Sequence, residues 1–134
     1  MKFSRGAVVV VDLDPTAGRE QRGVRPCVVV SDPDVIGDPR FPLVCVVPVT
    51  GTPGEGLLYP ALAPGPSGLA KRSYALIDQL RSIDKRRIRR VFGELAPDVI
   101  AAIHEGQAVF LGRGHRLHGS RAQPVQCPGV RSER

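Results

Sequence analysis

The chain has 134 residues, of which 42% are hydrophobic, and a formal net charge of +6 at pH 7. This length predicts one domain with its own core. The apolar runs, such as the one at residues 7–11, are far shorter than the roughly 20 residues that a membrane-spanning helix needs, so no such helix is expected. The basic start of the chain runs into Asp12 instead of a small-residue cleavage site, so we expect a cytoplasmic protein.

Arginine supplies most of the positive charge, because only three of the 19 basic residues are lysines. A guanidinium matches phosphate geometry and stacks on bases, so this bias favours nucleic acid as a partner. A GC-rich genome would also enrich arginine, glycine and proline, and composition alone leaves both explanations open. Residues 113–134 hold five arginines, one glutamate and few apolar residues, which predicts a basic, disordered tail after a domain of residues 1–112.

Three β-branched segments predict the core strands, at residues 6–13, 26–32 and 41–50. Pro48 is expected at the end of the third strand, since proline cannot donate to a central ladder. Cys27 and Cys45 lie within these apolar segments, and no cysteine has disulfide or metal spacing, so the thiols should be inert. The segment 32–38, with three aspartates, is interpreted as a solvated turn.

Further along, residues 56–62 and 73–83 are interpreted as two more strands, the second with a bulge. A Gly/Pro-rich exposed loop is expected at 63–72, and a short basic strand or turn at 86–95.

The segment 96–112 predicts a helix, with Pro97 in the first turn and Gly112 as the left-handed residue at its end. Its apolar stripe is expected to comprise Val99, Ile100, Ile103, Gln107 and Phe110 or Leu111, leaving His104 and Glu105 on an exposed face. Five or six short strands followed by a helix predict a mainly β, α+β fold: a small SH3-like antiparallel barrel with a C-terminal helix across it.

The motifs of common enzyme classes are missing from the sequence, which has no GxxxxGK[ST], HExxH, CxxC or GxSxG. Histidines occur only at 104, 115 and 118, so a two-histidine ribonuclease would have to use the tail. The remaining candidate is Arg25, at the junction of a Gly-rich loop and a strand, where Pro26 favours extended backbone. A guanidinium held there can bind a phosphate and stabilise charge developing on it, although the spacing alone also fits an arginine at a strand edge.

Four segments together resemble a known family: "RGAVVVVDLDPTAGREQRGVRPCVVVSD", "VVPVT", "ALIDQLRSID" and "GELAPDVIAAI". In this order and spacing they are similar to the MazF/PemK toxin endoribonucleases of type II toxin-antitoxin systems, over about residues 5–112. The resemblance implies the CcdB/PemK-like barrel acting as a homodimer, without metal or cofactor. It also implies cleavage of single-stranded mRNA, tRNA or rRNA at short sequences, inhibition of translation and growth, and a cognate MazE-like antitoxin.

The resemblance also implies roles for particular residues. Arg25 and Thr50 match the catalytic pair, and Glu20 matches the glutamate that could act as a base. The remaining positions implied in RNA binding are Arg19, Gln21, Arg22, Asp78, Gln79, Arg81 and Ser82. Two residues, Ala7 and Gly51, depart from the family pattern. They leave the catalytic groups in place, but the resemblance does not extend to the detail of the loop after the third strand, which helps to set which RNA sequence enters.

Two other functions remain open from the residues. A CcdB-like gyrase poison could use the same barrel, because a fold does not fix its chemistry, but it would have no use for Arg25 with Thr50. A non-catalytic SH3-like binding module would need an exposed aromatic platform. With no Trp, four Phe and two Tyr, the chain is poorly supplied for stacking.

Overall fold

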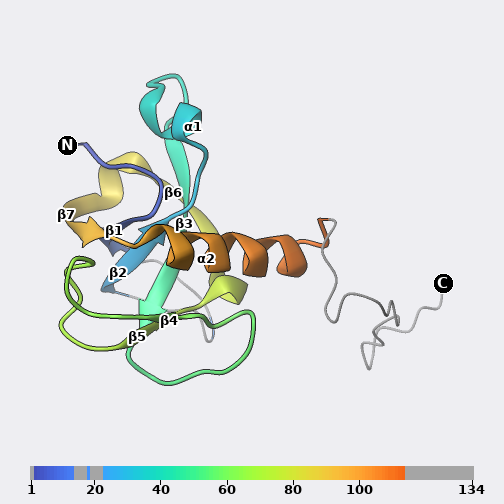
Figure 1. Cartoon of the computed structure of the whole chain (residues 1–134). Helices are drawn as coiled ribbons and strands as arrows, with labels where there is room; N and C mark the ends of the chain where they lie inside the picture. The colour runs from blue at the N-terminus through green and yellow to red at the C-terminus, as the bar shows by residue number, and fades with distance from the viewer. Residues whose placement is uncertain (1, 14–17, 19–22, 114–134) are drawn as a thin grey trace.

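The computed structural model describes residues 2–13, 18 and 23–113. Figure 1 shows a strongly bent sheet with α2 lying across it. The elements in chain order are β1 (Ala7–Asp12), β2 (Val24–Val29), α1 (Pro33–Gly37), β3 (Leu43–Thr50), β4 (Ala61–Leu62), β5 (Ser73–Ala75), the 3₁₀ helix η1 (Ile77–Gln79), β6 (Arg81–Asp84), the 3₁₀ helix η2 (Lys85–Arg87), β7 (Ile88–Glu94) and α2 (Pro97–Phe110).

All strand pairs are antiparallel, in the order β4-β5-β3-β2-β1-β7, with β6 also paired to β3. The long strand β3 pairs with β2 along one edge and changes partner along the other, from β6 at 43–46 to β5 at 49–50. Pro48 lies within β3 at this change of partner, where its missing N–H costs the sheet least. The expected small barrel is therefore confirmed as a mostly antiparallel half-barrel with a C-terminal helix.

The central strands β1 to β3 are buried on both faces over most of their length, which explains their unbroken apolar runs. Val8, Val28 and Val47 belong to one core, under α2, together with Ile103. Alternate residues, such as Val9, belong to a second core on the opposite face. Because successive side chains of a strand point to opposite faces, neither core tolerates a polar residue in these runs.

Helix α2 packs through its middle and not along its whole length. Ile103 and Gly106 are buried, and a Cβ added at Gly106 would lie 2.7 Å from the carbonyl oxygen of Leu57. Phe110 or Leu111 was expected to complete the apolar stripe, but the two are 45% and 53% exposed, so the stripe ends one turn earlier. Gly112 ends the helix with φ of 69°, as predicted.

His104, expected on the exposed face of α2, is partly buried instead. This burial and the nearby positive charge of Arg5 lower the pKa of its imidazole. No helix in the described part of the chain is long and apolar enough to cross a membrane.

The expectation of a single strand at 73–83 was wrong. The segment forms β5 and β6 with η1 between them, because β3 offers each strand a separate part of its edge. Backbone hydrogen bonds hold the intervening turn, from Leu76 N to the Pro48 oxygen at 2.8 Å and from Ile77 N to the Leu58 oxygen at 3.0 Å. The expected strand at 56–62 is shortened to β4, directly after Pro60.

Two further interpretations need correction. The segment 32–38 contains the short helix α1, whose N-cap Asp32 accepts a hydrogen bond from Asp34 N at 2.8 Å. The segment 63–72, which we call the strap, is not simply an exposed loop, because Ser67 and Leu69 are buried. The Ser67 hydroxyl donates to the Ala63 oxygen at 2.8 Å, which closes a compact turn.

Burial makes the Cys27 thiol unreactive. Desolvation raises the pKa of Cys27 to about 12, although the positive charge of Arg81 opposes the shift. Since the thiolate is the nucleophile, we expect no alkylation of Cys27 by iodoacetamide at pH 8 in the folded protein and rapid alkylation in urea, measured by peptide mass spectrometry. Equal labelling in both conditions would contradict the burial of Cys27.

Candidate functional site

Arg25 on β2 and Thr50 on β3 each lie two residues beyond the last pair of the β2–β3 ladder, Cys27 with Pro48. Extending that antiparallel register would place Arg25 across from Thr50. Both side chains would then lie on the face shared by Cys27 and Pro48, because side chains alternate along a strand. Arg25 is also paired with Val11 of β1, so β1 and β2 fix it together.

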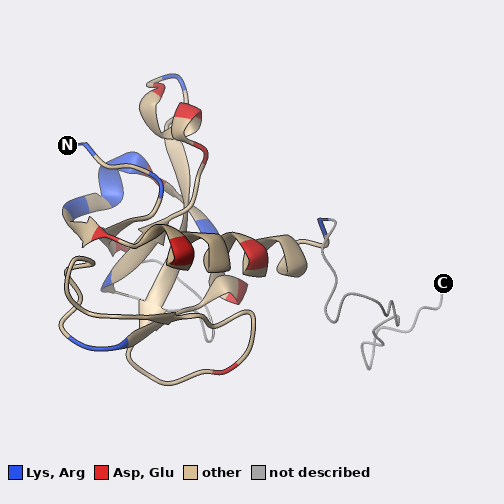
Figure 2. Cartoon of the chain, in the orientation of Figure 1, with Lys and Arg blue, Asp and Glu red and all other residues tan. Residues whose placement is uncertain are grey.

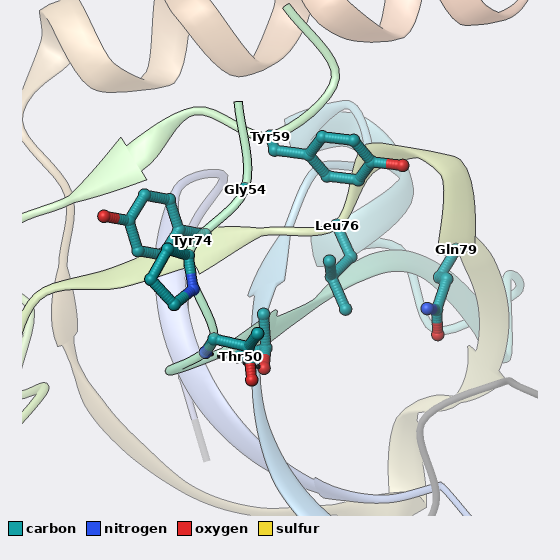
Figure 3. Close-up of a pocket in the computed structure, with 8 residues that line it drawn as sticks. Thr50, Gly54, Tyr59, Tyr74, Leu76 and Gln79 are labelled. Atoms are coloured by element: carbon teal, nitrogen blue, oxygen red, sulfur yellow. Dashed lines mark hydrogen bonds between the residues drawn. The ribbon is translucent and has the colours of Figure 1, made fainter. Parts of the chain in front are cut away.

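Thr50 opens into a pocket of about 400 Å³ next to the end of β3. Its hydroxyl oxygen accepts a hydrogen bond from Thr52 N at 3.2 Å and retains its own proton to donate. Figure 3 shows two tyrosines and Gln79 arranged around Thr50. The pocket is lined by Thr50, Thr52, Pro53, Gly54, Tyr59, Tyr74, Leu76 and Gln79.

The tyrosines at 59 and 74, the only two in the chain, both line this pocket, and the sequence interpretation missed them. Tyr59 donates its hydroxyl to the Asp78 carboxylate at 2.5 Å, and this bond raises the pKa of Tyr59. Tyr74 pairs with Thr50 across β5 and β3, and its hydroxyl accepts from Arg72 Nε at 3.2 Å. The scarcity of aromatic residues in the sequence therefore concealed a local concentration of them.

Arg81 and Ser82 were both expected to bind RNA, but they point to opposite faces of β6. Arg81 pairs with Val46, and its Nη1 donates to the Leu13 oxygen at 3.3 Å, at the end of β1. Ser82 pairs with Cys45, so its side chain lies on the other face. The structure thus brings Arg81 towards the ends of β1 and β2 and separates Ser82 from it. The expected residues Arg19, Glu20, Gln21 and Arg22 lie outside the described residues.

Additional arginines surround the end of β1. Arg87 Nη1 donates to the Asp12 oxygen at 3.4 Å, and Arg89 forms an ion pair with the Asp12 carboxylate at 3.3 Å. Figure 2 shows basic residues gathered on η2 and the adjoining start of β7. Together with Arg81, these residues surround the end of β1 with positive charge.

Within the described ranges, no three His, Cys, Asp or Glu side chains gather where they could hold a metal ion.

The fold and this site define a class of protein. The family of PemK-like, MazF-like toxins of type II toxin-antitoxin systems matches residues 4–111, so the chain belongs to it. The chain is a homologue of the endoribonuclease MazF.

Among individual relatives, the Endoribonuclease MazF of Staphylococcus saprophyticus is 28% identical over 120 residues, covering 88% of this chain and 98% of the relative. The crystal structure of MazF from Deinococcus radiodurans superposes with a TM-score of 0.69 at 30% identity, covering 81% of this chain and 96% of that one. A MazE-MazF structure from Deinococcus radiodurans gives a TM-score of 0.65 at 29% identity, covering 83% and 96%.

Proposed function

We propose that this chain is a sequence-specific, metal-independent endoribonuclease that cleaves single-stranded RNA. One observation carries the proposal: Thr50 lines a pocket with two tyrosines at the end of β3, next to the strand β2 that carries Arg25, in a chain that matches the MazF-like toxins over residues 4–111. A guanidinium and a hydroxyl together can donate hydrogen bonds to phosphoryl oxygens. Such a pair suits a reaction in which negative charge increases on phosphate.

The proposed reaction uses the RNA's own 2′-hydroxyl as the nucleophile, so the enzyme supplies no nucleophilic side chain. The 2′-oxygen bonds to phosphorus, loses its proton to a base, and displaces the 5′-oxygen of the next nucleotide, which gains a proton. The products are a 2′,3′-cyclic phosphate and a 5′-hydroxyl. Arg25 and Thr50 stabilise the pentacoordinate transition state, while Glu20 remains a candidate base outside the described residues. DNA, which lacks the 2′-hydroxyl, is not a substrate.

The pocket beside Thr50 is proposed to hold a base next to the reacting phosphate. Tyr59 and Tyr74 offer rings for stacking, a contact that proteins commonly make with the bases of single-stranded RNA. Gln79, at the end of η1, adds an amide that can both donate and accept. Asp78 accepts the hydrogen bond from the Tyr59 hydroxyl. Its proposed role is therefore to hold the Tyr59 ring in place as well as to line the groove.

The proposed partners are a second copy of the chain and a cognate antitoxin. MazF from Deinococcus radiodurans has been crystallised with MazE, and that relative supports an antitoxin for this chain. An acidic segment is the kind of partner that the basic surround of β1 would attract. Binding of such a segment over the site would block RNA and so inhibit the toxin.

The proposal is tested by incubating the purified protein with a mixed RNA pool in EDTA and mapping the new ends by sequencing. We expect cleavage at one short sequence, 5′-hydroxyl ends, and a loss of about 10²-fold or more in Thr50→Ala, which removes one phosphate donor. Thr50→Ser, which keeps the hydroxyl, should retain most of the activity. An intact pool together with inhibition of gyrase would favour the CcdB-like alternative, and an intact pool with RNA bound would favour a non-catalytic module.

A further inference from the structure

The end of the Lys71 side chain lies over Gly51, the residue that follows Thr50. A Cβ added at Gly51 would lie 2.7 Å from Lys71 Cε and 2.9 Å from Lys71 Nζ. Real Cβ atoms essentially never approach another atom this closely, so a side chain at 51 would push the flexible end of the lysine aside. Gly51 thus leaves room for an ammonium beside the residue that follows Thr50.

The position of Lys71 is set by the strand that follows it. The Ser73 hydroxyl donates to the Lys71 carbonyl at 2.9 Å, and β5 begins at Ser73. β5 then pairs Tyr74 with Thr50, so the segment that carries Lys71 is tied to the end of β3. Figure 2 shows this basic segment, residues 71–72, directly before β5.

The charge of Lys71 is uncompensated within the described part of the chain, where its ammonium forms no ion pair with a carboxylate. Lys85 is a useful contrast, because its Nζ donates to the Val35 oxygen at 2.8 Å and to the Asp38 oxygen at 3.1 Å. Lys85 therefore has a structural role, whereas Lys71 presents its charge beside the candidate site.

We propose that Lys71 binds a backbone phosphate of the RNA on the Gly51 side of Thr50, as a third cationic or hydroxyl donor alongside Arg25 and Thr50. This inference rests on the proposed function. An ammonium is a compact charge with three donors, suited to phosphate without the planar geometry that a guanidinium requires. The role of Lys71 is electrostatic binding, and the nucleophile and the proton carriers of the reaction are unchanged.

The first test compares Lys71→Ala, Lys71→Arg and the control Lys2→Ala, which removes the same charge from an exposed lysine before the start of β1. We expect Lys71→Ala to lower kcat/KM for the mapped RNA by about tenfold, Lys71→Arg to restore much of it, and Lys2→Ala to match the wild type. Binding is measured with the same RNA carrying a 2′-deoxynucleotide at the cleavage position. There, Lys71→Ala should reduce the slope of log K against log salt by about 0.7, the value for one phosphate contact with a single strand.

A second test uses the contact itself. Gly51→Ala should push the end of the lysine aside and lower kcat/KM by less than Lys71→Ala does, and the double variant should be no worse than Lys71→Ala alone, because neighbours that share one interaction are not additive. Unchanged thermal melting of each variant shows that the fold is kept.

Equal kcat/KM and equal salt slopes in Lys71→Ala and Lys2→Ala would overturn the inference, as would additive losses in the double variant. These outcomes leave wild-type cleavage intact and so differ from failure of the proposed function, in which the wild type itself cleaves no RNA.

Discussion

Replacing Arg25 with alanine is expected to lower kcat for RNA cleavage by about 10²–10³-fold, the cost of removing one preorganised donor from a developing oxyanion. Arg25 is exposed and lies outside both cores, so the free energy of unfolding should change little. The measurement is single-turnover cleavage of the mapped RNA at saturating enzyme, which separates the chemical step from binding.

Two variants make the Arg25 result specific. Arg25→Lys keeps the positive charge but loses the planar fork, so we expect an activity between those of the wild type and Arg25→Ala. Arg40→Ala removes an 83% exposed arginine whose ion partner is Asp38, two residues away, and should cleave like the wild type. Full activity in Arg25→Ala would remove Arg25 from the mechanism and leave it as a strand-edge residue.

The strands that the sequence predicted best are those with a purely local signal. β1 and β2 are runs of β-branched residues, and burial on both faces requires such runs whatever their partners are. Helix α2 likewise begins at Pro97 and is followed by a left-handed Gly112. Each of these features follows from the chemistry of a few neighbouring residues.

The site depends on pairings that no local pattern contains. Arg25 and Thr50 lie on neighbouring strands only through the pairing of β2 with β3, and Tyr74 meets Thr50 only because β3 changes partner from β6 to β5. The family resemblance named Arg25 and Thr50 but gave no indication of Tyr59 or Tyr74. The sequence pattern around a tyrosine is the same whether its side chain faces a pocket or solvent. For Tyr74, the pairing with Thr50 across the sheet determines that the side chain faces the pocket.

The strap, residues 63–72, shows how a remote residue positions this site. It appeared to be an exposed loop because it is rich in glycine and proline, yet it is fastened to β7. The Glu94 amide donates to the Pro66 oxygen at 3.2 Å, and a Cβ added at Gly93 would lie 2.1 Å from that same oxygen. Lys71 lies near the end of the strap and β5 follows it directly, so the attachment of the strap to β7 helps to place both the ammonium and Tyr74.

Gly93→Ala is therefore expected to destabilise the protein by about 1–3 kcal/mol, the usual cost of overpacking, because the added methyl collides with backbone that cannot rotate away. Urea unfolding should show a lower midpoint with an unchanged slope. Gly37→Ala is the matched control, since no atom lies within 4 Å of a Cβ added there and the residue is helical. That control should be neutral or stabilising by about 0.4–1 kcal/mol.

The two glycine variants also separate stability from function. At a temperature where Gly93→Ala remains folded, we expect its KM for RNA to rise, because a displaced strap moves Lys71 and Tyr74 away from Thr50 while Arg25, on β2, keeps its place. Gly37→Ala should leave KM unchanged. If Gly93→Ala loses stability but keeps the wild-type KM, β5 holds the site without the strap, and the pairing of Tyr74 with Thr50 is sufficient to position it.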